Sequence, residues 1–485
     1  MNKIILILSV WMAVGLASCY EDKGDYDYQA INEIAISGIE KEYTLQRWNE
    51  LSIRPGLAFS TQKADEVAYV WEIDGKVVSR ESELKYTVSN NIADDPYKCR
   101  LGVLHKSQDS YYYRDFTLKV ISPYEKGLLV LSEQDGKAML SFRLENSVEP
   151  GFDKWIFKQE NNDYLEGRPL SLEQPAWSLN ADVFVATSKG NYRLARKTLK
   201  YLKRYDGSNA LVKDPDFEMK FCVFTDMVSG EDYGCAIGTN GQVYTFREYT
   251  DFFSSPSLKP IPDYNDATNL IDYELSDKCL VYTTSYGQVR RFLGYDNKEG
   301  RYMLFMNRSG ITADVEQLNN AYVRTPTIGM PLLAVGMWSY NKFGSFFYDP
   351  ETNVAKVVAS HNNSFQNVKP ESLETLTSHK FTPSTILKFC DVTGRAVFSS
   401  GHLIYQLYMD DVTAEPELLC DKLPEGAIIT CLKFSDDRKR LYAGVQSARS
   451  DEYAGDIYIL NAETGAILET CKGVGGKPMD IIEKF

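Results

Sequence analysis

The stretch Gly455-Asp456-Ile457-Tyr458-Ile459-Leu460 decides the fold, because its pattern recurs along the chain. A glycine opens a short alternating strand, and a buried-type strand and a few polar residues precede it. The same pattern begins at six earlier glycines, namely Gly136, Gly190, Gly241, Gly287, Gly344 and Gly401. Glycine supplies the positive φ that a tight hairpin turn requires. A hairpin that recurs seven times, with a mean spacing of about 53 residues, predicts an all-β, seven-bladed β-propeller over residues 124–485.

The two ends of this repeat region indicate how the ring closes. The last repeat contains four strand-like runs in order, residues 428–434, 441–445, 456–460 and 466–470. The first repeat begins at Gly127 with its second strand, so its innermost strand is missing. Residues 476–485 align with residues 426–434, an innermost strand. We therefore expect residues 478–485 to complete the first blade and to cover the open sheet edges.

Residues 31–122 predict a separate domain ahead of the repeats. About seven short alternating runs, among them 67–73 and 97–104, are separated by turn signals such as Asp74-Gly75. This spacing favours an immunoglobulin-like β-sandwich, with Trp71 as a buried aromatic anchor. Cys99 has no partner on an early strand, so the disulfide of antibody domains is not expected.

The composition agrees with β structure and excludes several classes of protein. The 485 residues include 32 Tyr and 23 Phe, which favour strands. A hydrophobic fraction of 44% excludes a disordered chain and a small disulfide scaffold. The net charge of −14 argues against nucleic-acid binding, which needs a basic surface. The length favours about three domains, but the repeat joins residues 124–485 into one ring and leaves two.

Residues 1–18 are expected to be a signal peptide. Lys3 precedes an apolar run over residues 4–17, which is too short to span a bilayer but matches a signal-peptide core. The run ends in Leu16-Ala17-Ser18-Cys19, which resembles the lipobox of bacterial lipoproteins, where cleavage before the cysteine accompanies its acylation. The resemblance implies an outer-membrane lipoprotein whose only membrane contact is the lipid on Cys19. The alternative is an ordinary signal peptide with a chance cysteine.

Residues 19–30 form an acidic tether. Four carboxylates follow Cys19 within the stretch Glu21-Asp22-Lys23-Gly24-Asp25-Tyr26-Asp27. The stretch predicts a solvated, extended spacer. It also resembles the acidic surface-export signal of lipoproteins of Bacteroidetes, which implies a protein that faces the cell exterior. An accidental run of charges is the alternative.

The whole segment from Cys19 to Ser122 resembles one lipoprotein family. It opens with Cys-Tyr-Glu-Asp-Lys-Gly-Asp-Tyr-Asp-Tyr and carries Tyr69-Val70-Trp71-Glu72-Ile73-Asp74-Gly75. These features resemble the PKD-like lipoproteins of Bacteroidetes. The resemblance implies an N-terminal PKD/Ig-like sandwich and proteins that occur beside TonB-dependent outer-membrane receptors. Capture of ferric siderophores is among the roles attributed to this family.

The sequence carries no motif for catalysis, a cofactor or a metal. The four histidines, at positions 105, 361, 379 and 402, show no metal-ligand spacing, and no C-x-x-C occurs among the eight cysteines after Cys19. Nucleophile-elbow, P-loop, dinucleotide and EF-hand patterns are also missing. Cys222 with Cys235, or Cys420 with Cys431, would be able to approach across strands, but buried free thiols are favoured. We therefore expect a protein that is not an enzyme and holds neither cofactor nor metal.

A basic segment, residues 189–204, contains seven Lys or Arg and no acid. As a helix, it would place six cations on one face, which would suit an anionic surface. The repeat instead predicts a strand, a turn and a strand, because residues 194–199 align with turns at 348–353 and 460–465. We follow the repeat and expect a locally basic blade on an acidic protein.

Candidate binding residues come from loops expected to join the second and third strands of the blades. They are Lys189, Tyr286, Tyr340, Lys342 and Arg449. Aromatic and cationic tips would stack on and pair with an anionic aromatic ligand, or stack on sugar rings. The alternative is that these side chains are simply solvated loop tips.

Together these features predict a non-catalytic cell-surface lipoprotein that captures a ligand for a TonB-dependent transporter, with a ferric siderophore favoured. One alternative is a glycan- or peptide-binding protein of a nutrient-uptake system. Another is a propeller hydrolase that acts on extracellular polysaccharide, which would need an inward-facing carboxylate pair at catalytic separation.

Overall fold

The computed structural model divides the chain into two compact units, Met1–Ile121 and Ser122–Phe485. The structure describes residues 31–61, 66–89, 92–93, 95–145, 147, 151–176, 179–228, 231–246, 251–254, 256–262, 268–283, 290–306, 314–315, 317–318, 321–322, 326–361 and 368–485. The expected signal peptide, Cys19 and the acidic tether lie outside these residues. In the described part of the chain, no helix has the length and apolar character needed to cross a membrane.

The first unit is a β-sandwich. Its larger sheet has the order β2 (Glu42–Gln46), β9 (Ser110–Ile121), β8 (Tyr97–His105), β5 (Val67–Ile73) and β6 (Lys76–Ser79), with β2 parallel to β9. Two smaller sheets pair β1 (Ile34–Ser37) with β4 (Gly56–Phe59) and β3 (Glu50–Ile53) with β7 (Leu84–Thr87). The sandwich prediction is confirmed.

Trp71 is the aromatic anchor of the sandwich, as expected. Its side chain is fully buried, its ring edge packs on Phe116 with centroids 6.3 Å apart, and its indole N–H donates to the Glu81 carbonyl at 2.9 Å. The hydrogen bond satisfies the polar end of the ring, so that the apolar area can be buried without leaving a donor unpaired. Cys99 is buried and free.

The second unit consists of successive antiparallel sheets, which we number 1 to 7 in ring order. Sheet 1 is β39 (Lys477–Lys484), β10 (Gly127–Gln134) and β11 (Lys137–Leu144), and sheet 2 is β12 (Pro169–Glu173), β13 (Val183–Thr187), β14 (Gly190–Leu194) and β15 (Tyr201–Tyr205). Sheet 3 is β16 (Met219–Val228), β17 (Glu231–Gly238) and β18 (Val243–Phe246), and sheet 4 is β21 (Leu275–Thr283), β22 (Arg290–Asp296), β23 (Arg301–Met306) and β24 (Asp314–Val315).

The remaining sheets follow the same plan. Sheet 5 is β27 (Leu332–Ser339), β28 (Lys342–Asp349), β29 (Val354–His361) and β30 (Glu374–Leu376); sheet 6 is β31 (Leu387–Cys390), β32 (Arg395–Ser400), β33 (Leu403–Tyr408) and β34 (Glu417–Cys420). Sheet 7 is β35 (Ile428–Phe434), β36 (Arg440–Gln446), β37 (Gly455–Asn461) and β38 (Ile467–Gly475). Short pieces complete the unit: the pairs β19 (Ile261–Pro262) with β20 (Leu270–Ile271) and β25 (Gln317–Leu318) with β26 (Ala321–Tyr322), helix α2 (Ile156–Asn161), and 3-10 turns at Leu179–Ala181 and Pro370–Ser372.

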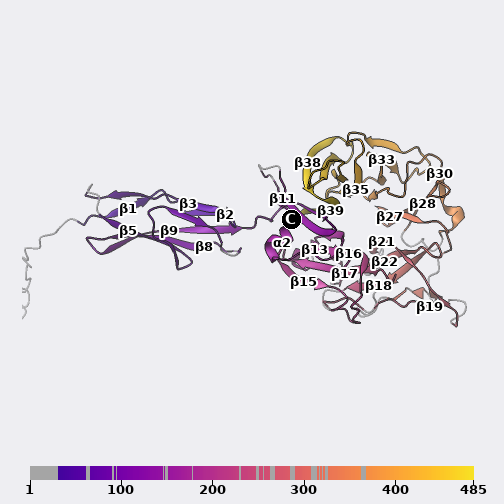
Figure 1. Ribbon diagram of the computed structural model, residues 1–485, viewed down its shortest axis with the longest axis horizontal. Coiled ribbons are helices and arrows are strands. Elements are labelled where there is room, and N and C mark those ends of the chain that lie inside the picture. The colour runs from indigo at the N-terminus through magenta and orange to yellow at the C-terminus, as the bar shows by residue number, and fades with distance from the viewer. Residues whose placement is uncertain are drawn as a thin grey trace, which may run out of the picture. The chain divides into compact units, whose positions relative to one another are not determined.

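The first strands of these sheets form a closed ring, as Figure 1 shows. β12 contacts β39 and β16, and the contacts continue through β21, β27, β31 and β35 back to β39. β39 also pairs antiparallel with β10, with Leu129 opposite Ile482 and Val130 opposite Ile481. The C-terminal strand therefore closes a β-propeller, as the alignment of residues 476–485 predicts.

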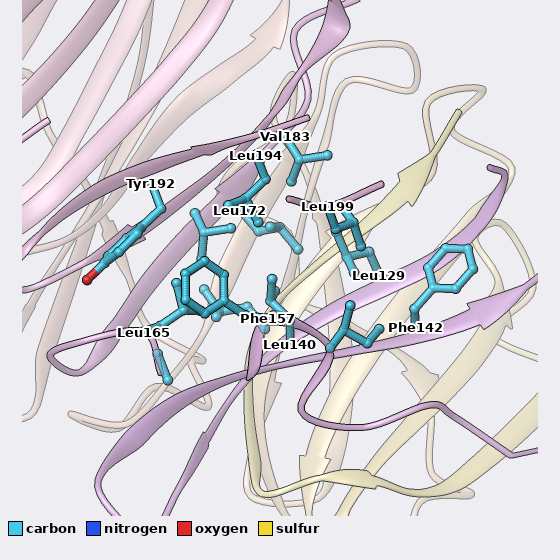
Figure 2. Close-up of a cluster of buried hydrophobic side chains, with 14 of the residues drawn as sticks. Leu129, Leu140, Phe142, Phe157, Leu165, Leu172, Val183, Tyr192, Leu194 and Leu199 are labelled. Atoms are coloured by element: carbon cyan, nitrogen blue, oxygen red, sulfur yellow. The ribbon is translucent and has the colours of Figure 1, made fainter. Parts of the chain in front are cut away.

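The apolar core lies between neighbouring sheets. Figure 2 shows the cluster between sheets 1 and 2, where Leu129, Phe142, Leu172 and Val183 converge and α2 contributes Phe157. Leu129, Leu172 and Val183 are fully buried. Burial of a side chain of this size stabilises the fold by about 1.5–3 kcal/mol. Each sheet therefore depends on its neighbour for stability.

The glycine repeat matches the strands in five sheets and is displaced by one hairpin in two. Gly136 and Gly401, with φ of 73° and 62°, lie in hairpins between second and third strands, as expected. Gly344 lies inside β28, a second strand, and the left-handed residue of the preceding hairpin is Asn341, with φ of 57°. Asparagine tolerates this conformation, so Asn341 makes the hairpin turn that the sequence pattern assigned to Gly344. Gly287 lies outside the described residues, between β21 and β22.

Candidate functional site: the propeller channel and its mouth

Five charged side chains of the innermost strands, which border the central channel of the ring, are linked by their charges. They are Glu173 on β12, Lys278 on β21, Lys388 on β31, Lys433 on β35 and Asp480 on β39. Each affects the pKa of at least one of the others by charge. Because Coulomb interactions weaken with distance and with screening by solvent, these side chains form one electrostatic cluster, which we call the channel cluster.

An ion pair between Lys433 and Asp480 anchors this cluster. The Lys433 ammonium lies 2.9 Å from Asp480 Oδ1 and also donates to the Leu172 carbonyl at 3.3 Å. Asp480 accepts hydrogen bonds from the backbone N–H groups of Leu172 at 2.9 Å and Ile481 at 2.8 Å. Burial opposes the charge on Lys433, but Asp480 and Glu173 outweigh it and raise its pKa. The pair thus joins sheets 7, 1 and 2.

Glu173 lies in an environment that favours its neutral form. Burial, followed by the negative charge of Asp480, raises the pKa of Glu173 to about 8, although Lys433 and Lys388 act in the opposite direction. Its Oε2 atom is buried and has no hydrogen-bond partner within the described part of the chain. At neutral pH we therefore expect a protonated carboxyl group that has a proton to donate.

Lys388 differs from the other cations of the cluster. It has solvent-accessible surface, yet enclosure by protein lowers the pKa of its ammonium despite the attraction of Asp480, and Lys433 and Lys278 lower it further. Lys433 forms an ion pair with Asp480, and Lys278 forms one with Asp277 at 3.1 Å. Among the residues whose placement is described, Lys388 makes no ion pair.

A cavity of about 510 Å³ opens at the channel mouth, where the innermost strands end. Its volume lies in the range of ligand sites, roughly 300–1,000 Å³. Apolar and aromatic residues line it, including Phe434 and Phe485, together with the acidic residues Glu173, Asp436 and Glu483 and the basic residues Lys433 and Arg438. Arg438 Nε lies 2.8 Å from Asp391 Oδ1. The cavity thus combines apolar surface with charged groups of both signs.

Two of the predicted binding residues, Lys189 and Arg449, lie away from this mouth. Both follow second strands, so they occupy the opposite face of the ring. Lys189 forms an ion pair with Glu218, and Arg449 makes two hydrogen bonds to Asp456 of 2.8 and 2.7 Å. Arg449 lines a second cavity of about 600 Å³, whose other charged side chains include Asp451, itself 2.8 Å from Arg449. Each of these two cations is thus paired with a carboxylate.

Tyr340 and Lys342 lie on the same side of the ring as the mouth. Contrary to the sequence prediction, they flank the hairpin between the first and second strands of sheet 5, because Asn341 rather than Gly344 makes its turn. Tyr340 is 81% exposed, and Lys342 Nζ lies 4.8 Å from the centre of the Trp338 ring. Tyr286 lies outside the described residues. The structure therefore divides the predicted site between two faces.

The basic segment forms β14, a turn and β15, as the repeat predicts, and the helix alternative is wrong. Acidic residues from elsewhere pair with its cations. Arg193 lies 2.8 Å from Asp182 and Arg204 2.6 Å from Glu166, while Lys203 pairs with Asp251. The segment is basic in sequence but largely neutralised in space, so it does not form an anion site by itself.

All eight cysteines after Cys19 are free, so neither Cys222 and Cys235 nor Cys420 and Cys431 are bonded. No group of three His, Cys, Asp or Glu side chains suited to a metal was found in the portion of the chain that the structure describes.

Sequence reasoning missed the channel cluster, although a signal was present. The tripeptide Leu-Lys-Phe occurs at residues 387–389 and again at 432–434, each time in an innermost strand. A lysine between apolar residues in such a strand must point either into the channel or toward a buried partner. The repeat of this tripeptide at matching positions was the available signal.

Comparisons with known proteins support the N-terminal assignment. The model of the PKD-like family matches residues 19–169. Among curated protein sequences, none matches the chain.

Several solved structures are similar to the chain at low identity. A quinonprotein alcohol dehydrogenase-like protein from Bacteroides thetaiotaomicron has 13% identity and a TM-score of 0.49, with 92% of this chain and 97% of that chain covered. The β-propeller domain of Swd1 from Myceliophteria thermophila has 9% identity and a TM-score of 0.43, with 65% and 90% covered. The match of the family model alone confirms the predicted resemblance to the PKD-like family for residues 19–169, which include the N-terminal sandwich.

Proposed function

We propose that this chain is a non-catalytic cell-surface lipoprotein that captures a small anionic, aromatic ligand at the channel mouth, with a ferric siderophore favoured. The observation that carries the proposal is the mouth cavity of about 510 Å³, which combines aromatic lining with Lys433 and Arg438, although Asp436 and Glu483 also border it. A ligand with aromatic rings and negative charge would use both features.

The aromatic part of the site consists of Phe434 and Phe485, which are both partly exposed at the mouth. The Arg196 guanidinium lies 5.8 Å from the centre of the Phe485 ring and donates to the Phe485 carbonyl at 3.2 Å. Its contacts with Arg196 hold this ring at the rim. A planar ligand ring would gain stacking area there, while Arg438, which is still 33% exposed beside Asp391, would contact the negative charge of the ligand.

Location and partner are also part of the proposal. The sequence Leu16-Ala17-Ser18-Cys19 supports a lipid anchor in the outer membrane, and the acidic tether supports display on the cell exterior. A tethered binding protein raises the local concentration of ligand at a neighbouring transporter. We therefore propose a TonB-dependent outer-membrane receptor as the partner that accepts the ligand.

Titration of the mature protein with a ferric tris-catecholate complex, followed by tryptophan fluorescence, tests this function. Arg438→Gln removes a cation at the mouth and should weaken binding about tenfold, the worth of one charged hydrogen bond. Lys439→Gln is the matched control, because Lys439 is adjacent in sequence and its side chain is 82% exposed. Absence of quenching together with binding to an oligosaccharide or peptide panel would favour the alternative of a glycan- or peptide-binding protein.

A hydrolase is the second candidate, because Glu173 and Asp480 are two inward-facing carboxyl groups with different environments. A raised pKa suits Glu173 to a general acid. Asp480, however, is bound by Lys433 and two backbone N–H groups, which suits a structural role. Release of reducing sugar from polysaccharide by the wild type but not by Glu173→Gln would establish the hydrolase instead.

A further inference from the structure

We propose that the channel cluster contains a carboxylate-binding site, in which the Lys388 ammonium and the Glu173 carboxyl group hold one carboxylate. The site lies next to the mouth cavity, since Glu173 belongs to both. The inference deepens the proposed function, on which it rests for the suggestion that a captured ligand supplies the carboxylate.

The cations of the channel cluster are unequally paired with acidic groups. Lys433 forms an ion pair with Asp480, and Lys278 forms one with Asp277. Among the described residues, Lys388 is therefore the cation of the channel cluster that has no ion-pair partner. Lys388 is exposed to solvent, but the nearby charges of Lys433 and Lys278 repel its ammonium, so that a counter-ion would be favourable here. With Glu173 protonated, and with Asp277 counted as the counter-ion of Lys278, the uncompensated positive charge of the cluster is that of Lys388. One monoanionic group would neutralise it, whereas a metal cation would add to the repulsion.

Glu173 has a carboxyl oxygen that lacks a hydrogen-bond partner among the described residues. Oε2 of Glu173 is buried without a hydrogen-bond partner among the described residues, and Lys388 is close enough to affect the pKa of this carboxyl group. A carboxylate has two oxygens. One would accept from the Lys388 ammonium and the other from the protonated Glu173, so that a single group satisfies both side chains.

The pH dependence follows from the groups that face the site. Above about pH 8, Glu173 loses its proton and repels a carboxylate. Lys388, which faces Asp480 on β39, Lys433 and Cys431 on β35 and Lys278 on β21, also loses its charge more readily than an exposed lysine. Carboxylate affinity should therefore fall as pH rises through 8, and binding should be accompanied by proton uptake.

Line broadening of ¹³C-labelled acetate in the presence of the mature protein tests the site directly. We expect saturable broadening with the wild type and with Lys439→Met, and at least a tenfold loss of affinity with Lys388→Met. Lys388→Arg keeps the charge and should retain part of the binding, and circular dichroism checks that each variant is folded. Equal broadening with wild type and Lys388→Met, or no saturable broadening with the wild type, would overturn the site.

A second arm identifies the source of the carboxylate. We would compare a ferric siderophore complex that bears a free carboxylate with a ferric tris-catecholate that lacks one. If Lys388→Met weakens only the first, the carboxylate comes from the ligand; if it weakens neither but abolishes acetate binding, the site takes a free carboxylate. Both outcomes support the site. If the wild-type protein binds acetate but neither ferric complex, the proposed function is wrong and the carboxylate site still stands.

Discussion

Lys433 and Asp480 lie 2.9 Å apart on strands of different sheets, and their ion pair connects the strand that closes the ring to the sheet beside it. Asp480 also accepts the backbone N–H of Leu172 in sheet 2. One carboxylate thus holds three neighbouring sheets at the point where the channel opens.

Asp480→Asn should destabilise the protein by about 2–3 kcal/mol, because it leaves Lys433 without a counter-ion in a partly buried position. The value lies below that for a fully buried pair, since the side chain of Lys433 is still 33% exposed. Urea denaturation measures the loss. Asp421→Asn, which breaks an exposed pair with Lys422, is the control and should change stability by less than 1 kcal/mol. Equal effects of the two substitutions would contradict the role of Asp480.

Deletion of residues 478–485 should lower the melting temperature strongly and promote aggregation. The deletion removes most of β39 and exposes the backbone groups of β10 along one edge of sheet 1. Thermal unfolding and light scattering would measure both effects. An unchanged melting temperature would show that the ring does not depend on this strand.

Glu173 should make the protein less stable as pH rises from about 4.5 to 8. Its pKa is raised from 4.5 to about 8 in the folded state, so between these values the folded chain binds more protons than the unfolded chain and stability falls. The slope from this residue is at most about 1.4 kcal/mol per pH unit. Glu173→Gln should remove it and gain stability relative to wild type toward pH 8, as urea denaturation at several pH values would show. Glu463→Gln, an exposed change, should leave the slope in place; parallel curves for wild type and Glu173→Gln would refute the assignment.

Lys388→Met should raise the free energy of unfolding by up to about 0.5 kcal/mol in the absence of carboxylates, because solvent screens the exposed ammonium. The substitution removes the repulsion of the Lys388 ammonium by Lys433 and Lys278 and replaces the lysine with an apolar side chain of similar length. Thermal or urea unfolding in carboxylate-free buffer measures the gain. A clear loss of stability would mean that the ammonium is satisfied in the free protein.

The repeat could be predicted from the sequence because hairpin glycines and alternating strands are local features. Gly136 and Gly401 are turn residues as expected, whereas Gly344 was assigned to a turn that Asn341 makes. That difference moved Tyr340 and Lys342 to the other face of the ring. The pairing of Arg193 with Asp182, and of Lys203 with Asp251, depends on how loops fold back on the blade, which the local sequence does not specify.

The channel cluster was not predicted for a related reason. Glu173 and Asp480 are 307 positions apart in the chain, and ring closure alone brings them together. Single-sequence patterns indicate which strand a residue belongs to, but the direction of a side chain on an innermost strand follows from the register with neighbouring sheets. Only the twice-occurring tripeptide Leu-Lys-Phe points toward the channel.

The pairing of β10 with β39 constrains the order in which the propeller folds. Leu129 and Ile482 are paired although 353 positions separate them, so this contact has a high entropic cost of loop closure and should form late. Before that step the ring is an open arc, in which Asp480 does not face Glu173 and Lys388 and the mouth has no complete wall. A ligand that binds the mouth would therefore bind only molecules that have completed the circle, and its presence would select for them.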